Sequence, residues 1–110
     1  CMTVVELTQL THWKMINSGN LESQICGVYA GDLLSYVMGN GETGQAWVTM
    51  QTHQNVIAIC SLKEFSVLVL VDGNELDEEA LQSAKDNDVN VLVSPLPAYE
   101  TMKKLVQLGY

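Results

Sequence analysis

The sequence predicts a compact α/β domain with a four- or five-stranded, mainly parallel sheet flanked by helices. Short apolar runs alternate with helix-like segments, which is typical of repeated strand–helix units. The centres of these runs, Val28, Val48, Leu68 and Val91, are 20, 20 and 23 residues apart, one strand and one helix per step. In addition, residues 67–71 are apolar at every position. This is expected of a strand that is covered by helices on both faces.

The segments follow in a regular order. Residues 3–10 place Val4, Leu7 and Leu10 on one helical stripe, with Thr3 as the candidate cap. Asn, Ser, Asp and Gly mark turns at residues 17–20, 31–32 and 72–74. Strands are predicted at residues 14–16, 25–29, 46–50, 65–71 and 89–93. Further helices are predicted at residues 33–38, 55–62, 77–85 and 98–108.

The length and composition indicate one folding unit. A chain of 110 residues is near the commonest domain size, and 47% hydrophobic residues suffice for a single core. We therefore expect a single domain over residues 1–110. Cys1 precedes Met2 and is set aside as either a cleavage remnant or a processed end.

The charge argues against two classes of partner. The net charge is −8, with five Lys and Arg against thirteen Asp and Glu. Nucleic acids and anionic membranes both require clustered cations, so we expect neither as a partner. Cys26 and Cys60 lie in apolar runs, and we expect both to be buried in a reducing compartment. With no membrane-length apolar stretch and no signal-peptide pattern, we expect a cytoplasmic protein.

A polar segment separates the strand at 46–50 from the following helix. Open α/β sheets bind ligands at the carboxyl ends of their strands. We therefore expect a ligand site at this position. The candidate hydrogen-bonding residues are Thr49, Gln51, Thr52, His53 and Asn55, with Asp32 and Asp72 at the rim. The alternative is that these residues have structural roles. Thr52 or His53 would cap the helix at residues 55–62, Asp32 would cap the helix at residues 33–38, and Asp72 would belong to a turn.

Two motifs that suggest catalysis are in the wrong context. Residues 39–44 read GNGETG, a literal GxGxxG, but a helix precedes them and a strand follows, the reverse of a dinucleotide-binding turn. We interpret the motif as a helix stop and loop. A Walker A loop is excluded because Gln45 and Ala46 follow Gly44 where Lys and Ser or Thr are required.

Groups for acid–base or metal chemistry are scarce. His12, beside Trp13, is expected to be a partly buried packing residue, and His53 is the better candidate for a general base. No nucleophile accompanies His53 at a recognisable spacing. The acidic cluster at residues 75–79 suits a helix N-terminus better than a cation. We therefore predict no catalytic residue, no metal and no cofactor.

Two stretches carry a family resemblance, GVYAGDLLSYVMGN from Gly27 and WVTMQTHQNVIAICSLKEFSVLVLVDG from Trp47. They resemble the compact stand-alone form of the DRTGG domain, which is similar in fold to the N-terminal domain of HPr kinase/phosphorylase. The resemblance covers about residues 3–109. The name-giving motif is not preserved, because residues 51–53 stand where an Asp-Arg pair is expected and residues 71–73 where a paired glycine is expected.

The resemblance implies an accessory domain that serves regulation and subunit contacts. Such domains are often fused to CBS pairs, phosphotransacetylase or cobyrinic-acid-synthase-like modules. Stand-alone members also look like proteins encoded near iron-only hydrogenases and redox sensors. The kinase label that some of them carry is not transferred here, because this chain has no P-loop.

The leading prediction is a non-enzymatic regulatory module that forms a homodimer and senses a small metabolite or nucleotide. Trp47, Met38, Met50 and Tyr36 are the types enriched in interface cores, and they are the candidates for the dimer contact. The alternative is that they fill the monomer core. Two other functions stay open: a pure protein–protein interaction adaptor, for example in hydrogenase or redox regulation, and an enzyme that depends on His53.

Overall fold

Four parallel strands form most of the central sheet, in the order in which they occur along the chain. The computed structural model describes residues 1–110. The sheet contains β2 Lys14–Asn17, β4 Gly27–Ala30, β5 Gln45–Thr49, β6 Val67–Leu70 and β7 Val91–Val93. Their spatial order is β2-β7-β6-β5-β4, and only β2 runs antiparallel to its neighbour. The sequence prediction of a mainly parallel sheet is confirmed.

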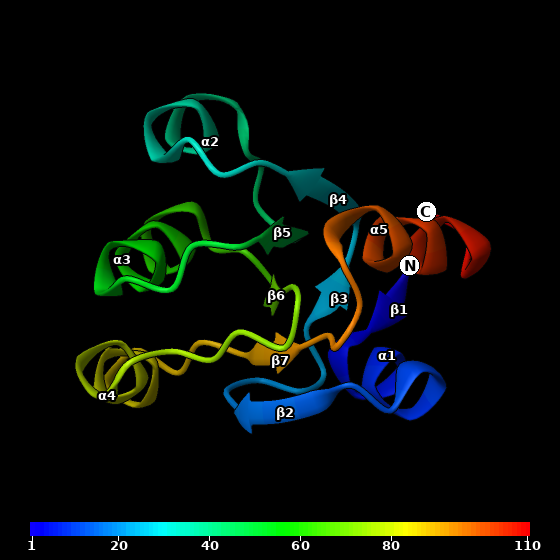
Figure 1. Cartoon of the computed structure of the whole chain (residues 1–110), viewed down its shortest axis with the longest axis horizontal. Coiled ribbons are helices and arrows are strands. Elements are labelled where there is room, and N and C mark those ends of the chain that lie inside the picture. The colour runs from blue at the N-terminus through cyan, green and yellow to red at the C-terminus, as the bar shows by residue number, and fades with distance from the viewer.

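Helices cover both faces of this sheet (Figure 1). One face carries the three helices that connect the parallel strands, α2 Leu34–Asn40, α3 Gln54–Lys63 and α4 Glu78–Asp86. They share a face because right-handed crossovers between successive strands return on the same side. The other face carries α1 Val4–Thr11, α5 Ala98–Gln107 and a small antiparallel sheet of β1 Met2–Thr3 and β3 Gln24–Ile25. A membrane-spanning helix needs a long apolar stretch, and no helix of this structure contains one.

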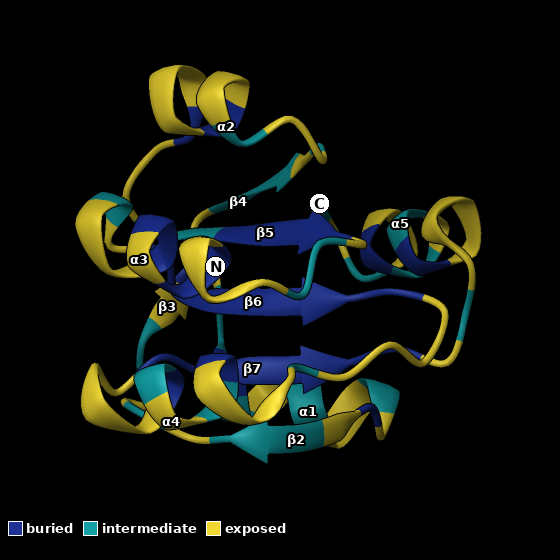
Figure 2. Cartoon of the chain, turned by 60° about the vertical axis from the view of Figure 1, so that its left-hand side comes forward, coloured by how far each residue is buried: buried dark blue, intermediate teal, exposed yellow.

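The strands contribute alternate side chains to two cores. In β6, Leu68 and Leu70 pack on the side of α2, α3 and α4, whereas Val67 and Val69 pack on the side of α1 and α5. Trp47 in β5 belongs to the first core and is fully buried. The three central strands are buried on both faces (Figure 2). The two-sided apolar pattern of the sequence is therefore confirmed, and the alternative that Trp47 fills the monomer core is correct.

Local capping chemistry sets the starts of α1 and α4. Thr3 accepts a hydrogen bond from the Glu6 amide while the Glu6 carboxylate accepts from the Thr3 amide, a capping box. Asp77 caps α4 by accepting from the Ala80 amide at 2.8 Å. The acidic residues at the start of α4 thus serve the helix N-terminus, as the sequence indicates.

The predicted strand over residues 25–29 is wrong as a single element. Ile25 ends β3, where it pairs with Met2, and Gly27 begins β4 in the other sheet. The chain changes sheets at Cys26, whose amide donates to the Gly44 carbonyl at 2.8 Å. Because Cys26 lies at this junction, its side chain is exposed, contrary to the prediction, whereas Cys60 is buried as predicted.

The glycine motif at residues 39–44 ends α2 and connects it to β5, so its interpretation as a helix stop and loop is confirmed. The Gly41 amide donates to the Val37 carbonyl at 2.8 Å and closes the helix. A Cβ atom at Gly41 would overlap Phe65 Cζ, so the glycine allows close packing on this ring. Gly44 has a φ of 85°, which favours glycine. The motif is therefore explained by packing and backbone geometry.

The predicted packing role of His12 is wrong. His12 is exposed and ends α1 in the left-handed conformation, with a φ of 57°. The neighbouring Trp13 is buried, with 6% of its surface exposed. The left-handed residue turns the chain so that Trp13 enters the core and His12 faces solvent.

Candidate functional site

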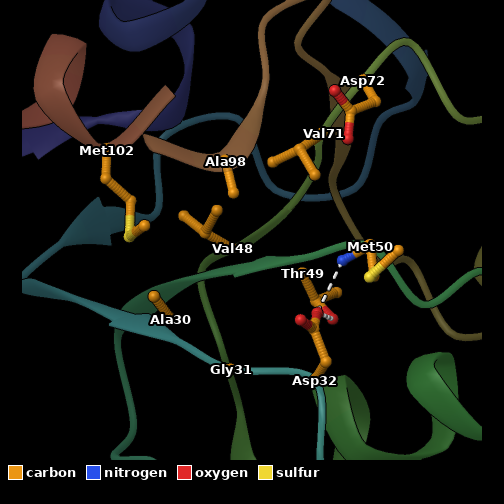
Figure 3. A pocket seen from close by; sticks show the side chains of 10 residues that line it. All are labelled: Ala30, Gly31, Asp32, Val48, Thr49, Met50, Val71, Asp72, Ala98 and Met102. Carbon is orange, nitrogen blue, oxygen red and sulfur yellow. Dashed lines mark hydrogen bonds between the residues drawn. The ribbon is translucent and has the colours of Figure 1, made fainter. Parts of the chain in front are cut away.

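A pocket of about 240 Å³ lies at the carboxyl ends of β4, β5 and β6, with the start of α5 as a further wall (Figure 3). Six of its ten lining residues are hydrophobic. These are Ala30, Val48, Met50, Val71, Ala98 and Met102. The polar lining side chains are Asp32, Thr49 and Asp72. The pocket therefore combines apolar walls with carboxylates, and it lies at the edge of the sheet where the sequence predicts a ligand site.

Asp32 is held in place by β5 and the residue that follows it. Its Oδ1 atom accepts a 2.7 Å hydrogen bond from the Thr49 hydroxyl and a 2.8 Å hydrogen bond from the Met50 amide. The Thr49 hydroxyl in turn accepts from the Gln51 amide at 3.2 Å. Both hydrogen bonds to the Asp32 carboxylate are charge-assisted, which makes them stronger than hydrogen bonds between neutral groups. Asp32 is thus a fixed feature of the pocket although it is exposed.

The alternative that Asp32 caps α2 is wrong. Leu33 occupies the N-cap position of α2, and no side chain caps this helix. The carboxylate of Asp32 is instead directed to the neighbouring strand, as Figure 3 shows. The Thr49 hydroxyl and the Met50 amide donate charge-assisted hydrogen bonds to this carboxylate at the end of β5. The carboxylate is therefore not available to the free amides of α2.

The polar segment after β5 has two parts. Gln51 turns back toward the pocket, where its Nε2 atom donates to the Asp32 carbonyl at 3.1 Å. His53 is the N-cap of α3, and its Nδ1 atom accepts from the Asn55 amide at 3.2 Å. Thr52, His53 and Asn55 do not line the pocket. The structure therefore places Asp32, Thr49 and Asp72 together in the pocket and Gln51 beside them, while His53 has the capping role that the sequence left open.

Asp72 reaches the pocket from a left-handed turn after β6. It has a φ of 57°, and Gly73 has a φ of 68°. The Asp72 amide donates to the Leu96 carbonyl and the Gly73 amide donates to the Ser94 carbonyl, both at 2.8 Å. These two bonds join the loop to the segment before α5. The turn that the sequence predicts is thus also one wall of the pocket.

The α5 wall is anchored by buried hydroxyl groups. Ser94 and Thr101 are fully buried, and their hydroxyl oxygens lie 2.8 Å apart. Ser94 also accepts from the Leu96 amide, and Thr101 donates to the Leu96 carbonyl. A satisfied buried network of this kind gives a segment one defined position. It places Ala98 and Met102 over the strand ends.

Sequence reasoning missed the apolar half of the site. Ala98 and Met102 come from the last helix, which is about 50 residues from Val48 along the chain. No local pattern connects them to the strand ends. Ala30 and Val71 could have been found, because each lies directly at the end of a predicted parallel strand.

A second hollow, of about 380 Å³, lies near the amino ends of β5, β6 and β7, opposite the Asp32 pocket. Only three of its twelve lining residues are hydrophobic, and it is more open to solvent. Binding sites for small molecules are mostly apolar with a few placed polar groups. The Asp32 pocket fits this description better. No group of three or more His, Cys, Asp and Glu side chains in the structure is arranged to hold a metal ion.

No protein-family model matches the sequence. No curated protein matches it either. Among solved structures, the chain is similar to the CBS and DRTGG domains of the regulatory region of Clostridium perfringens pyrophosphatase, which was crystallised with its activator diadenosine tetraphosphate. The TM-score is 0.74 at 13% sequence identity. The similarity covers 96% of this chain and 46% of that chain, so this chain spans less than half of that regulatory region. At this identity the similarity is one of fold, and it supports a DRTGG-like α/β fold for this chain.

Proposed function

We propose that this domain is a non-enzymatic regulatory module that binds a nucleotide or another small metabolite in the Asp32 pocket. The observation that carries the proposal is the pocket itself, an apolar hollow at the strand carboxyl ends with one carboxylate held by two hydrogen bonds. Open α/β sheets bind ligands at this edge. The structural neighbour is a regulatory region that was crystallised with a nucleotide activator, which supports the same class of function.

The composition of the pocket supports a binding role over a catalytic role. Its lining contains no histidine, cysteine, serine or lysine. Apart from the carboxylates, the one candidate nucleophile is the Thr49 hydroxyl, which is buried and donates its proton to Asp32 in a hydrogen bond. His53, the general base considered from the sequence, caps α3 outside the lining. We expect no hydrolysis of ATP and no phosphorylation of a protein substrate. Turnover that survives purification and is lost on His53→Ala would contradict this expectation.

Thermal shift with a panel of nucleosides, nucleotides and acyl phosphates tests ligand binding. A ligand that binds only the native state raises the melting temperature, by an amount that grows with its concentration. Ala98→Leu should remove the shift, because Ala98 is an exposed helical residue at the pocket wall and a larger side chain there fills the hollow. The matched control is Ala58→Leu, at an exposed position of α3 that does not line the pocket.

The panel also separates this proposal from the adaptor function. No shift with any compound would contradict ligand sensing and leave the adaptor as the better hypothesis. A shift that Ala98→Leu and Ala58→Leu both preserve would place the ligand elsewhere on the molecule.

The regulatory role includes self-association through the region around α2. Three large apolar side chains there are exposed, Leu33 and Tyr36 at 64% and Met50 at 55%. Leu33 directly follows Asp32 in the chain, and Met50 lines the pocket. The neighbouring strand β4 is an edge strand of the sheet. Exposed apolar side chains beside an unpaired strand edge favour association with a second copy, most simply as a two-fold dimer.

Light scattering over a dilution series tests this association. We expect a dimer mass at high protein concentration and a weaker association in Tyr36→Ser. Tyr99→Ser is the matched control, because Tyr99 is 70% exposed on α5, on the other face of the sheet. A monomer mass at every concentration, with and without nucleotides, would contradict the dimer.

A further inference from the structure

The charges around the Asp32 pocket restrict the chemistry of its ligand, and the inference drawn from them rests on the proposed function. Two carboxylates line the pocket, Asp32 and Asp72, and no Lys, Arg or His does. The chain as a whole has a net charge of −8. Phosphate groups in proteins are bound by cations, by clustered amides or by metal ions. A phosphate placed between these two carboxylates would be repelled.

Both carboxylates have free acceptor atoms. The two protein donors to Asp32 both bond Oδ1, so Oδ2 accepts no hydrogen bond from the protein. The side chain of Asp72 accepts no hydrogen bond from the protein, and only backbone groups form the bonds at Asp72 and Gly73. The pocket can therefore accept hydrogen bonds from a ligand. Sugar hydroxyls and exocyclic amines are ligand groups that donate such bonds.

The rest of the pocket is lined by apolar side chains. Figure 3 shows Ala30, Val48 and Met102 on the side away from the two aspartates. The volume of about 240 Å³ is below the roughly 300–1,000 Å³ typical of pockets for drug-sized ligands. It therefore takes one ring system with its substituents, and the remainder of a larger molecule would extend into solvent.

The N-terminus of α5 has the opposite charge preference, because a helix N-terminus favours negative groups. Ala98 begins this helix at the pocket wall, and no side chain caps its free amides. The first turn also contains Glu100, which supplies the negative charge that a helix N-terminus favours. The net field at this wall is therefore weaker than that of an uncapped helix without an acidic residue.

From these observations we infer that the Asp32 pocket recognises the nucleoside part of its ligand, with the sugar hydroxyls or the base amine on Asp32 and Asp72, and leaves any phosphate groups outside. The apolar walls contact the ring, and the carboxylates orient it. Phosphates then contribute repulsion instead of affinity. This is the reverse of sites that bind nucleotides mainly through their phosphates.

Calorimetric titration of adenosine, guanosine, cytidine and uridine, each beside its triphosphate, tests this inference. We expect at least one nucleoside to bind more tightly than its triphosphate at low salt. The difference should narrow at high salt, because salt screens the repulsion between phosphate and carboxylate. Inorganic tripolyphosphate should not bind or compete.

Two variants locate the recognition. Asp32→Asn keeps an acceptor for Thr49 and Met50 but replaces the free oxygen with a donor. It should weaken nucleoside binding about tenfold, as expected for loss of a charge-assisted hydrogen bond, and move the preference toward the triphosphate. Asp72→Asn should act in the same direction. Asp86→Asn, which makes the same charge change at an exposed position of α4 outside the pocket, should have no effect.

Each remaining result overturns the inference in a recognisable way. Tighter binding of a triphosphate or of tripolyphosphate, lost in Ala98→Leu, would keep the proposed function and refute nucleoside recognition. Binding of an aliphatic diamine such as putrescine, with no nucleoside bound, would show that the carboxylates select cations. No binding of any compound would refute both the inference and the proposed function.

Discussion

Asp32 and Thr49 are joined by a 2.7 Å hydrogen bond from the Thr49 hydroxyl to Asp32 Oδ1, which connects the end of β5 to the loop after β4. Thr49 is buried, with 2% of its surface exposed, whereas Asp32 is exposed. A buried hydroxyl thus fixes the position of an exposed carboxylate. We therefore expect this pair to set the geometry of the pocket and to contribute to the stability of the protein.

Thr49→Val should destabilise the protein by about 1–3 kcal/mol, because it removes the bond to Asp32 and the acceptor of the Gln51 amide. The valine has nearly the same shape, so packing is conserved. Urea denaturation measures the change. Thr49→Ser retains the hydroxyl and should lose less, and a cycle with Asp32→Ala should reveal a coupling energy between the two sites. Additive losses would show that the hydrogen bond contributes nothing.

Val69→Asp should prevent folding. Val69 is fully buried in β6, the middle strand of the sheet, on the side of α1 and α5. An unpaired carboxylate there has neither water nor a partner. Circular dichroism and thermal melting are the measurements. Val106→Asp makes the same change at a position of α5 that is 64% exposed, and it should fold normally. A folded Val69→Asp protein with an unchanged melting temperature would be incompatible with this strand assignment.

Cys60 should resist alkylation in the native protein, whereas Cys26 should react. Burial raises the pKa of the Cys60 thiol, because the charged thiolate is poorly solvated in the core. The thiolate is the reactive form, and access is also blocked. Mass spectrometry after treatment with iodoacetamide should find Cys26 modified and Cys60 unmodified until denaturant is added. Equal rates at the two residues would contradict the burial of Cys60.

The capping box of α1 should make stability depend on acid. The Thr3 amide, 2.9 Å from Glu6 Oε1, and the Thr3 hydroxyl, at 3.1 Å, hold the pKa of Glu6 below its usual value. A carboxylate whose pKa is lower in the folded state stabilises the protein above its unfolded pKa. This contribution is lost as the pH falls through the folded value.

Glu6→Gln tests this linkage, because glutamine can form the same box but does not titrate. We expect the wild type to melt higher than the variant at neutral pH, and the difference to narrow as the pH falls through the acidic range. Glu22→Gln is the control, since no hydrogen bond to the Glu22 side chain is present. A difference between wild type and Glu6→Gln that is constant with pH would show that the Glu6 charge does not stabilise the helix.

The sequence alone determined the features that depend on neighbouring residues. The two-sided apolar pattern of residues 67–71 requires a buried parallel strand, because such a segment is stable only with helices on both faces. Thr3 identifies the start of α1, since a cap and its amides are at most three residues apart. The acidic residues 75–79 indicate the start of α4 through their charge. The same local chemistry explains why the Gly39–Gly44 motif ends a helix instead of binding a dinucleotide.

Only the tertiary structure decided which groups meet. Asp32 has the sequence signature of a helix cap, but the Thr49 hydroxyl and the Met50 amide, brought close by the pairing of β4 with β5, bind it instead. Met102 became a pocket wall because Ser94 and Thr101 anchor α5 over the strand ends. Cys26 is exposed because the chain changes sheets there. These contacts join residues far apart in the chain, and their partners are set by the packing of the whole sheet, which no local pattern of residues encodes.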